Sequence, residues 1–423
     1  MVIVVGGGFS GALTAAHVAA RGLGCVVVEP GELGRGLAFG PAAEGLLLNT
    51  PARLMSALPD EPDHFVRWLG CAPGAFAPRV AYGAYAGATA AALAGERMVH
   101  VRARAIAVER DGAAYVVACD DGSRVRGRAL VLALGNAPPR APAPIDPAWP
   151  EYRADPPAAP GDEVLVLGTA LTAIDAIARL RGRGHRGRIT AVSRRGLVPE
   201  SYAGAPPGEQ VPSGRDAIAT PVSVPAELVA RPSLRALIAW WRTAGGDAAG
   251  RAAGVRAAAP AIWRALPADD RGAFLRHVRA RLDLVRHRAP PALRELVDRG
   301  RAEGWLDVVA GRVAAAHRTG DGIAYRIGAI ARTARWIVDA TGPDRDLARS
   351  ASPLVRDLVA RGWVVPDPLG LGAITGARGE LGAPGVFAVG PWRVAAVWES
   401  TAVPELRVQA AETAAAVAAY VRA

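Results

Sequence analysis

Three glycines close to the start of the chain have a spacing that suits a phosphate-binding turn. Gly6, Gly8 and Gly11 form a GxGxxG pattern, which follows the apolar run at residues 2–5 and precedes an alanine-rich stretch. The first glycine permits a tight turn, the second lets the backbone approach a pyrophosphate, and the third lets a helix pack closely. Amides at the start of that helix would face the phosphates. The pattern therefore predicts a strand, a glycine turn and a helix that bind a dinucleotide.

An acidic residue supports this interpretation. Glu29 ends the next apolar run, residues 25–28, where an acid binds the adenosine ribose hydroxyls in dinucleotide-binding folds. A glycine-rich turn without a ligand is the alternative for an isolated GxGxxG, but here strand, helix and acid agree. Since an acid at this place disfavours a 2′-phosphate, FAD or NAD fits the first site better than NADP.

A second unit of the same kind begins at residue 163. An apolar strand at 163–167 leads into the sequence GTALTA, which starts with Gly168 and Thr169 and has alanine at the second and third glycine positions. The following strand ends in Arg194 and Arg195 instead of an acid. Paired arginines at this place could hold the 2′-phosphate of NADP, whereas the alternative is an ordinary basic loop in an arginine-rich protein.

Two further glycines follow apolar strands. Gly135 comes after the run at residues 129–134, and Gly342 comes after the run at 336–340. Such turns mark the places where the chain of a flavoprotein with two dinucleotide domains passes between its lobes. Their order along the chain favours that architecture.

The other elements complete an α/β organisation. Residues 102–126 alternate and are broken at Asp-Gly turns, which predicts a small antiparallel meander. We also expect a proline-rich linker at 136–161, a helical region at 224–302 and a closing helix at 407–421. The predicted fold is therefore α/β, with two Rossmann-like dinucleotide-binding lobes, a small antiparallel β-meander and a helical insertion.

Composition narrows the class of protein. A chain of 423 residues suggests two lobes, because single cores seldom grow beyond about 250–300 residues. The net charge of +11 comes from arginines spread along a chain without lysine, which disfavours a nucleic-acid-binding patch. No apolar run reaches the roughly 20 residues of a membrane span, and no targeting segment precedes the first strand. We therefore expect a cytoplasmic protein without nucleic-acid or membrane partners.

The three cysteines argue against two other kinds of chemistry. Cys25, Cys71 and Cys119 lie far apart and form neither a CxxC pair nor a metal-ligand spacing. Dithiol reductase chemistry and zinc binding are both disfavoured, and we expect no metal site.

Stretches across nearly the whole chain resemble the bacterial FAD/NAD(P)-binding family that is related to the two-dinucleotide-domain monooxygenases and N-hydroxylases. In order, the resembling stretches are GLAFG, LLNTPARLMSALPDEPDHFVRWL, GTALTAID, VSRRGLVP, FLRHVRARLDLVRHRAPP, DATGPDRDL and GPWRVAAVWESTAVPELRVQA. The resemblance implies an FAD-binding domain built from residues 1–140 and 331–423. An NAD(P)-binding domain at 160–330, with a helical insertion at about 214–305, would lie between these segments.

The same resemblance implies which residues lie near the flavin. On the first segment of the FAD domain they are Gly36, Asn49 and Met55. On the last segment they are Gly390, Trp398, Glu399, Ser400 and Thr401. A helix that starts near Val403 would direct its positive end at the flavin ring or the pyrophosphate.

Some residues of the chain leave alternatives open. Glu399 is either an acid beside the flavin or a capping residue. The group that contains His277, Arg286, His287 and Arg288 is interpreted as a helix surface that docks the two lobes, in preference to a catalytic set. Ala170 stands where the family usually has glycine, and its methyl group could hinder a nicotinamide pyrophosphate.

The resemblance implies a reaction in which NADPH reduces FAD and molecular oxygen then hydroxylates a small amine or amino acid. We find no fingerprint of the Baeyer-Villiger or flavin-monooxygenase type. One alternative is an oxidase or dehydrogenase that needs no pyridine nucleotide, which Ala170 favours and the arginine pair opposes. The other is a non-catalytic FAD-binding redox sensor. The sequence does not fix the substrate, the catalytic residues or the oligomeric state.

Overall fold

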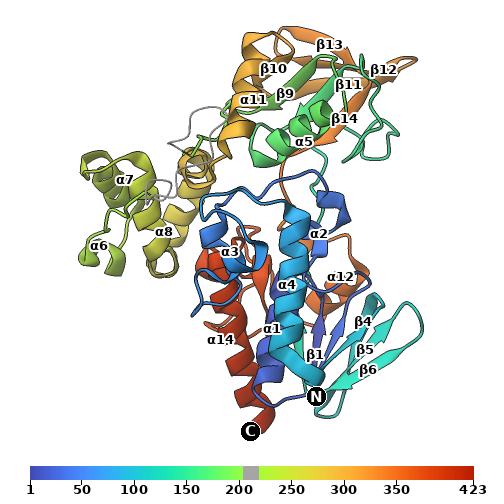
Figure 1. Ribbon diagram of the computed structural model, residues 1–423, viewed down its shortest axis with the longest axis vertical. Coiled ribbons are helices and arrows are strands. Elements are labelled where there is room, and N and C mark those ends of the chain that lie inside the picture. Colours follow the sequence, from blue (N-terminus) through green and yellow to red (C-terminus); the bar gives the residue numbers. More distant parts are fainter. Residues whose placement is uncertain (203–218) are drawn as a thin grey trace.

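The computed structural model describes residues 1–202 and 219–423, which form two lobes and a group of helices beside them (Figure 1). A five-stranded parallel sheet lies at the centre of the first lobe, in the order β15-β7-β1-β2-β3. Its strands are fully or largely apolar, and all but β3 are buried throughout, as expected when both faces of a parallel sheet are covered. The strands are β1 (Val2–Val5), β2 (Cys25–Val28), β3 (Met98–Val101), β7 (Ala129–Leu132) and β15 (Val386–Ala388).

Three helices cover one face of this sheet. α1 (Phe9–Ala20) packs against α4 (Arg79–Ala94) and against α14 (Val403–Arg422). Small side chains, mostly alanine, line these contacts and allow the helices to approach closely. The last part of the chain thus supplies both an edge strand, β15, and a covering helix, α14, to the lobe that the first residues begin.

The other face carries the predicted antiparallel meander. It consists of β4 (Ala105–Asp111), β5 (Ala114–Cys119) and β6 (Arg124–Gly127), and it packs with α12 (Pro353–Ala360) on the inward side chains of the sheet. The alternating stretches and the Asp-Gly turns at residues 111–112 and 121–122 predict this meander, and the structure confirms it.

The second lobe repeats the plan on a smaller scale. Its parallel sheet has the order β10-β9-β8-β14, and α5 (Leu171–Gly182) and α11 (Pro291–Ala302) cover one face. A second antiparallel meander, which the sequence pattern does not predict, covers the other face. The strands are β8 (Val164–Leu167), β9 (Ile189–Ser193), β10 (Leu306–Ala310), β11 (Val313–Thr319), β12 (Gly322–Ile327), β13 (Ile330–Ala334) and β14 (Trp336–Asp339).

Strand pairing moves one expected domain boundary. β13 pairs with β12 and β14 pairs with β8, so both belong to the second lobe and the boundary expected at residue 331 is wrong. The strand-forming run at 336–340 completes the second parallel sheet, and the chain returns to the first lobe only after it.

The helical insertion is shorter than expected at its end. Because α11 packs on α5 and β10, it is a covering helix of the second sheet, and the insertion therefore ends before residue 291. The expected start, near residue 214, lies outside the described residues. The described helices of the insertion are α6 (Ala226–Ala230), α7 (Leu234–Thr243), α8 (Ala248–Ala265), α9 (Ala268–Ala273), a π-helix (Phe274–Val278) and α10 (Arg279–Arg286).

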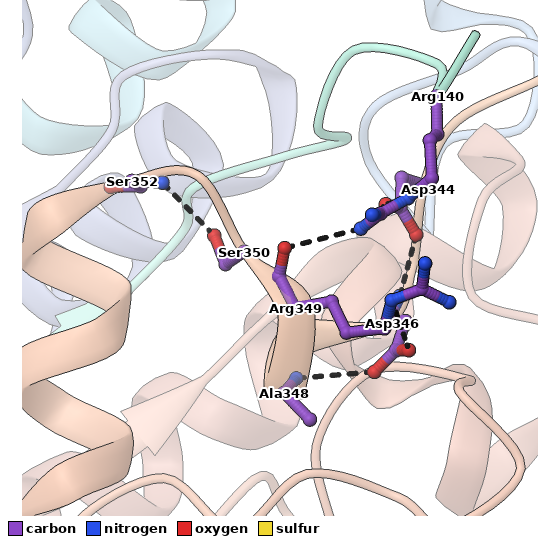
Figure 2. A network of polar contacts seen from close by, with 7 residues as sticks. All are labelled: Arg140, Asp344, Asp346, Ala348, Arg349, Ser350 and Ser352. Carbon is purple, nitrogen blue, oxygen red and sulfur yellow. Dashed lines mark hydrogen bonds and ion pairs between the residues drawn. The ribbon is translucent and has the colours of Figure 1, made fainter.

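Two linkers join the lobes and run antiparallel to each other. Ala137 on the outgoing linker forms a β-bridge with Asp344 on the returning one. Figure 2 shows how Arg140 reinforces this crossing, since its guanidinium donates to the Asp344 carboxylate and to the Arg349 carbonyl at 2.7 and 3.1 Å. A third contact between the lobes is the ion pair of Arg79 on α4 with Asp175 on α5, at 2.7 Å.

Candidate functional site

The first glycine turn can form only with glycine at two of its three positions. Gly6 has φ +97°, and a Cβ there would lie 2.3 Å from the carbonyl oxygen of Ala133. A Cβ on Gly11 would lie 1.9 Å from the carbonyl oxygen of Gly6. Both contacts are far inside the van der Waals limit, so these two glycines are required by the turn itself.

The presence of glycine at position 8 has a different explanation. Gly8 precedes α1 in an extended conformation, φ −62° and ψ −173°, which any residue can adopt. A Cβ on Gly8 would approach only Gly36, with its Cα at 3.4 Å, an ordinary contact. Since neither conformation nor packing requires glycine here, the bare backbone is explained by a ligand that must come close to it, as a pyrophosphate does. The residues present therefore fit a dinucleotide.

The Glu29 carboxylate is held in place by two backbone amides. The amides of Gly7 and Gly31 donate to its two oxygens at 2.8 and 2.9 Å. Each oxygen keeps a free lone pair, so the group can still accept hydrogen bonds from ribose hydroxyls. This position at the carboxyl end of β2 is the one that the sequence predicts for Glu29.

A short loop closes over the glycine turn. Gly36 starts α2 (Gly36–Phe39), and a Cβ on it would lie 3.0 Å from the Cα of Gly8. Gly83 and Gly87 on α4 let this loop approach, because a Cβ on either would meet a loop carbonyl within 2.7 Å. Gly36 thus lies against the predicted pyrophosphate site.

The other two expected residues of this segment lie farther along it. Met55 is buried in an apolar cluster that includes Tyr82 and Tyr85, whereas Asn49 is partly buried on the preceding loop. Their expected place beside the flavin stays a prediction.

The last segment of the chain lies beside the same turn. Gly390 has φ +83°, and a Cβ on it would lie 3.2 Å from Ser10 Oγ at the start of α1, directly after the glycine turn. The hydroxyl of Ser400 donates to the Gly390 carbonyl at 2.6 Å, and the Gln409 amide donates to the Glu399 carbonyl at 3.1 Å. These contacts fix the start of α14, which begins at Val403 as predicted, close to the first glycine turn. Thr401 is exposed just before it.

Trp398 has a strained backbone. It is the only described residue other than glycine with a positive φ, 58°, and the amide of Glu399 donates to the carbonyl of Val397 at 2.6 Å across it. This is a γ-turn, a conformation that costs about 1–3 kcal/mol and is often found at functional sites. The Trp398 ring packs on Trp263 and Phe274 of the insertion, with ring centroids 4.7 and 5.0 Å apart.

Glu399 is engaged by the helical insertion. Arg286 on α10 binds its carboxylate through two hydrogen bonds of 2.9 and 2.8 Å, with both side chains largely buried. The interpretation of Arg286 as a docking residue agrees with this geometry, and the Glu399 side chain caps no helix. His277 is exposed, and Arg288 stacks over Tyr202 at 4.1 Å.

The second glycine turn copies the backbone of the first. Gly168 has φ +127°, and a Cβ there would lie 2.3 Å from the Ala340 carbonyl oxygen, just as Gly6 meets Ala133. Ala170 precedes α5 with φ −86° and ψ −167°, close to the angles of Gly8. The backbone angles therefore tolerate alanine at this position. The second turn differs from the first by the methyl groups of Ala170 and Ala173 and by the side chain of Thr169. Gly135 and Gly342 both have positive φ, with open space around them, beyond the ends of β7 and β14.

The side chains around the second turn are already connected. Thr169 Oγ1 lies 2.8 Å from Ser193 Oγ and also bonds the Leu197 carbonyl, so this hydroxyl ties the turn to the loop after β9. On that loop Arg194 is exposed, whereas Arg195 donates to the carbonyl of Arg276 in the π-helix at 3.1 Å. A ligand phosphate would compete with that carbonyl for Arg195.

Both glycine turns lie at the carboxyl ends of parallel strands, where open α/β sheets bind their ligands. No cluster of three or more potential metal ligands occurs among residues 1–202 and 219–423, and none of the described helices is long and apolar enough to cross a membrane. The fold, with two parallel sheets and a glycine turn at the end of each, is like that of the class of two-dinucleotide-domain flavoproteins.

Comparisons with known proteins support this class. Residues 3–137 match the family described as FAD-NAD(P)-binding. No curated protein matches the sequence.

Solved structures show the same fold over the full length. The L-lysine 6-monooxygenase from Pseudomonas syringae is 16% identical, with TM-score 0.62 and coverage of 99% of each chain. The ornithine N-hydroxylase from Kutzneria sp. 744 is 14% identical, with TM-score 0.61 and 98% coverage of each chain. Thioredoxin reductase from Lactococcus lactis is 13% identical, with TM-score 0.54, and the match covers 100% of this chain and 98% of that one. At these identities the likeness shows the fold and leaves the reaction open.

Proposed function

We propose that this chain is an FAD-dependent oxidoreductase, and more specifically a monooxygenase that uses NADPH and molecular oxygen to hydroxylate a small amine or amino acid. The observation that carries the first part is Gly8, whose bare backbone only a closely approaching ligand explains, beside the oriented carboxylate of Glu29. The solved hydroxylases of similar fold support the second part. When bound, the flavin would supply the redox chemistry, and the protein would supply binding and orientation.

Separate groups of residues would bind the different parts of the two cofactors. Gly6, Gly8 and Gly11 would bind the FAD pyrophosphate, while Glu29 would hold the adenosine ribose. Amides at the start of α14 would stabilise negative charge on the reduced ring. The loop after β9 would bind the 2′-phosphate of NADPH.

Dithiol chemistry, known from thioredoxin reductases of similar fold, does not suit this chain. Cys25 and Cys119 are buried and Cys71 is only partly exposed, and no two of them form a disulfide. Burial raises the pKa of the Cys25 thiol to about 12, which removes its nucleophilic thiolate form at neutral pH.

A flavin enzyme that needs no pyridine nucleotide is the second candidate. Two observations favour it: the methyl group of Ala170 stands at the second turn, and the Thr169 hydroxyl is already used within the protein. A redox sensor without turnover is the third candidate.

Rapid mixing of the purified protein with nucleotides separates the three. We expect a yellow protein whose flavin absorbance is bleached by NADPH without oxygen and returns when oxygen is added. Bleaching by an amine or amino acid, but by neither NADPH nor NADH, would instead identify an oxidase or dehydrogenase. A flavin that no donor reduces would identify the sensor.

Replacing Arg194 and Arg195 together with alanine should remove the preference for NADPH over NADH. Each charge-assisted contact to a phosphate contributes roughly 1.5–3 kcal/mol, which corresponds to a loss of roughly tenfold to 100-fold per arginine. The measurement is the apparent affinity for each nucleotide during anaerobic flavin reduction. Arg183, which pairs with Asp155 elsewhere on this lobe, provides the control: Arg183→Ala should leave the preference intact. Equal use of both nucleotides by the unmodified protein would refute this assignment.

A further inference from the structure

The loop that closes over the first glycine turn is bound at both of its ends. We call residues 34–47 the covering segment, which contains α2. At its start, the amide of Gly34 donates to the Gly7 carbonyl in the glycine turn at 2.8 Å. At its end, Leu47 forms a β-bridge with Pro78, directly before α4. The covering segment therefore runs from the glycine turn to the start of α4.

The second lobe reaches this segment through α5, the helix that follows the second glycine turn. The Arg179 guanidinium on α5 donates to the Ala42 carbonyl at 2.6 Å. Four residues earlier on the same helix, Asp175 pairs with Arg79 at 2.7 Å. Residues four apart lie on the same face of a helix, so both contacts come from one face of α5. Figure 1 shows α2 at the end of the first lobe that faces this helix.

Arg79 joins three parts of the molecule. It is the first residue of α4, its Nη2 binds Asp175, and its Nε donates to the Leu47 carbonyl at 2.8 Å. Because the guanidinium is planar and rigid, the directions of these two contacts are fixed relative to each other. Arg79 thus links α5 directly to the end of the covering segment, while Arg179 binds its middle.

Burial makes the Arg79–Asp175 ion pair hard to replace with water. The two side chains are only 21% and 12% exposed. Burial raises the pKa of Asp175, whereas the charges of Arg79 and Arg179 lower it. Without Arg79, a largely buried carboxylate would lose its ion-pair partner, which is a costly arrangement. We therefore expect α5 to stay bound to the covering segment in the folded protein.

We propose that Arg79, Asp175 and Arg179 are positioning residues that hold the covering segment closed over the FAD pyrophosphate. Gly36 of this segment lies so close to the turn that a Cβ on it would be 3.0 Å from the Gly8 Cα. A dinucleotide bound against Gly8 therefore leaves faster when the segment is loose. The docked position of the second lobe sets the rate at which FAD dissociates. That the ligand is FAD rests on the proposed function, whereas the closure of the segment does not.

The rate of FAD dissociation, read from flavin fluorescence after rapid dilution, tests the proposal. Arg79→Met and Arg179→Met should each release FAD roughly tenfold faster, because truncating one partner of a buried polar contact acts mainly on dissociation. Arg79→Lys keeps the charge and should release FAD at an intermediate rate. Arg140→Met is the matched control: its contacts are with the returning linker (Figure 2), so it should leave the rate unchanged.

A double replacement separates this role from simple stabilisation. Arg79→Met combined with Asp175→Leu removes both buried charges, so Tm should return close to that of the unmodified protein. FAD should still dissociate as fast as from Arg79→Met, because the guanidinium that binds Leu47 is absent. A dissociation rate that recovers together with Tm would overturn the proposal, and so would an equal acceleration in Arg140→Met. If Arg79→Met alone fails to fold, the double variant and Arg179→Met decide by the same criteria.

Hydrogen exchange in the flavin-free protein tests the closure independently of FAD. Backbone amides of residues 34–47 should exchange faster in Arg79→Met and Arg179→Met than in the unmodified protein, and at the same rate in Arg140→Met. Unchanged exchange in both variants would overturn the proposal. Faster exchange in a protein that binds no FAD would instead support the closure of the segment by these arginines and refute the proposed function.

Discussion

Replacing Gly8 with valine is expected to give a folded protein that no longer holds FAD. The turn has room for a Cβ at this position, because that atom would meet Gly36 only at 3.4 Å and the backbone angles suit any residue. The valine would instead occupy the space that the pyrophosphate needs. We expect FAD affinity to fall by a factor of roughly 100 or more, which is about 2.7 kcal/mol. Flavin content after purification and FAD titration of the apoprotein measure the effect.

Two glycine-to-alanine variants make this result specific. Gly11→Ala places a Cβ 1.9 Å from the Gly6 carbonyl oxygen, so it should destabilise the lobe itself and lower Tm. Gly182→Ala, at the end of α5 with open space around it, should leave both Tm and flavin content unchanged. A Gly8→Val protein that keeps full FAD occupancy would show that the first turn does not bind the cofactor.

The sequence predicted those parts of the fold that depend on local patterns. Continuous apolar runs such as residues 2–5 mark buried parallel strands, and glycine spacing marks the turns. The second meander was missed because its first strand includes three consecutive alanines at 314–316, which show no apolar–polar alternation, although Asp321-Gly322 gives the same turn signal as in the first meander. The boundary at 331 failed for the same reason, since without β13 the following strand, β14, had no visible partner in the second lobe.

Of the candidate site, the sequence predicted the glycine turns and the acid after β2, but not the contacts between segments that are distant in the chain. Positions such as Gly6 and Glu29 could be found because a nucleotide constrains residue type at fixed spacing. The γ-turn at Trp398 could not, since a tryptophan with positive φ leaves no trace in the sequence. The ion-pair partner of Glu399 could not be predicted either, because Arg286 lies 113 residues away along the chain and only the packing of the insertion brings the two together.

Breaking the Arg286–Glu399 ion pair should lower the free energy of unfolding more than breaking the nearby Arg256–Glu405 ion pair. Arg286→Ala leaves the Glu399 carboxylate, only 8% exposed, without its cation, which should lower the free energy of unfolding by about 3–5 kcal/mol. Arg256→Ala is the matched control, because its pair with Glu405 is bidentate as well but lies at 24% and 21% side-chain exposure. Its loss should be smaller, about 1–2 kcal/mol. Chemical denaturation of the three proteins measures the difference, and equal losses would contradict the role assigned to burial.

A double replacement then decides whether Glu399 serves only to dock the insertion or also acts on the flavin. Arg286→Met combined with Glu399→Leu removes both buried charges and keeps apolar volume, so stability should return to within about 1–2 kcal/mol of the unmodified protein. If docking is the whole role, the double variant keeps its FAD, its flavin reduction potential and its rate of reduction. If the carboxylate acts on the flavin, the potential or the rate changes although the fold is restored. The position of Glu399, between the strained Trp398 and the Ser400 hydroxyl that contacts Gly390, leads us to expect an unchanged FAD content and a shifted potential. Identical flavin reduction potentials in the double variant and the unmodified protein would show that Glu399 serves only to dock the insertion.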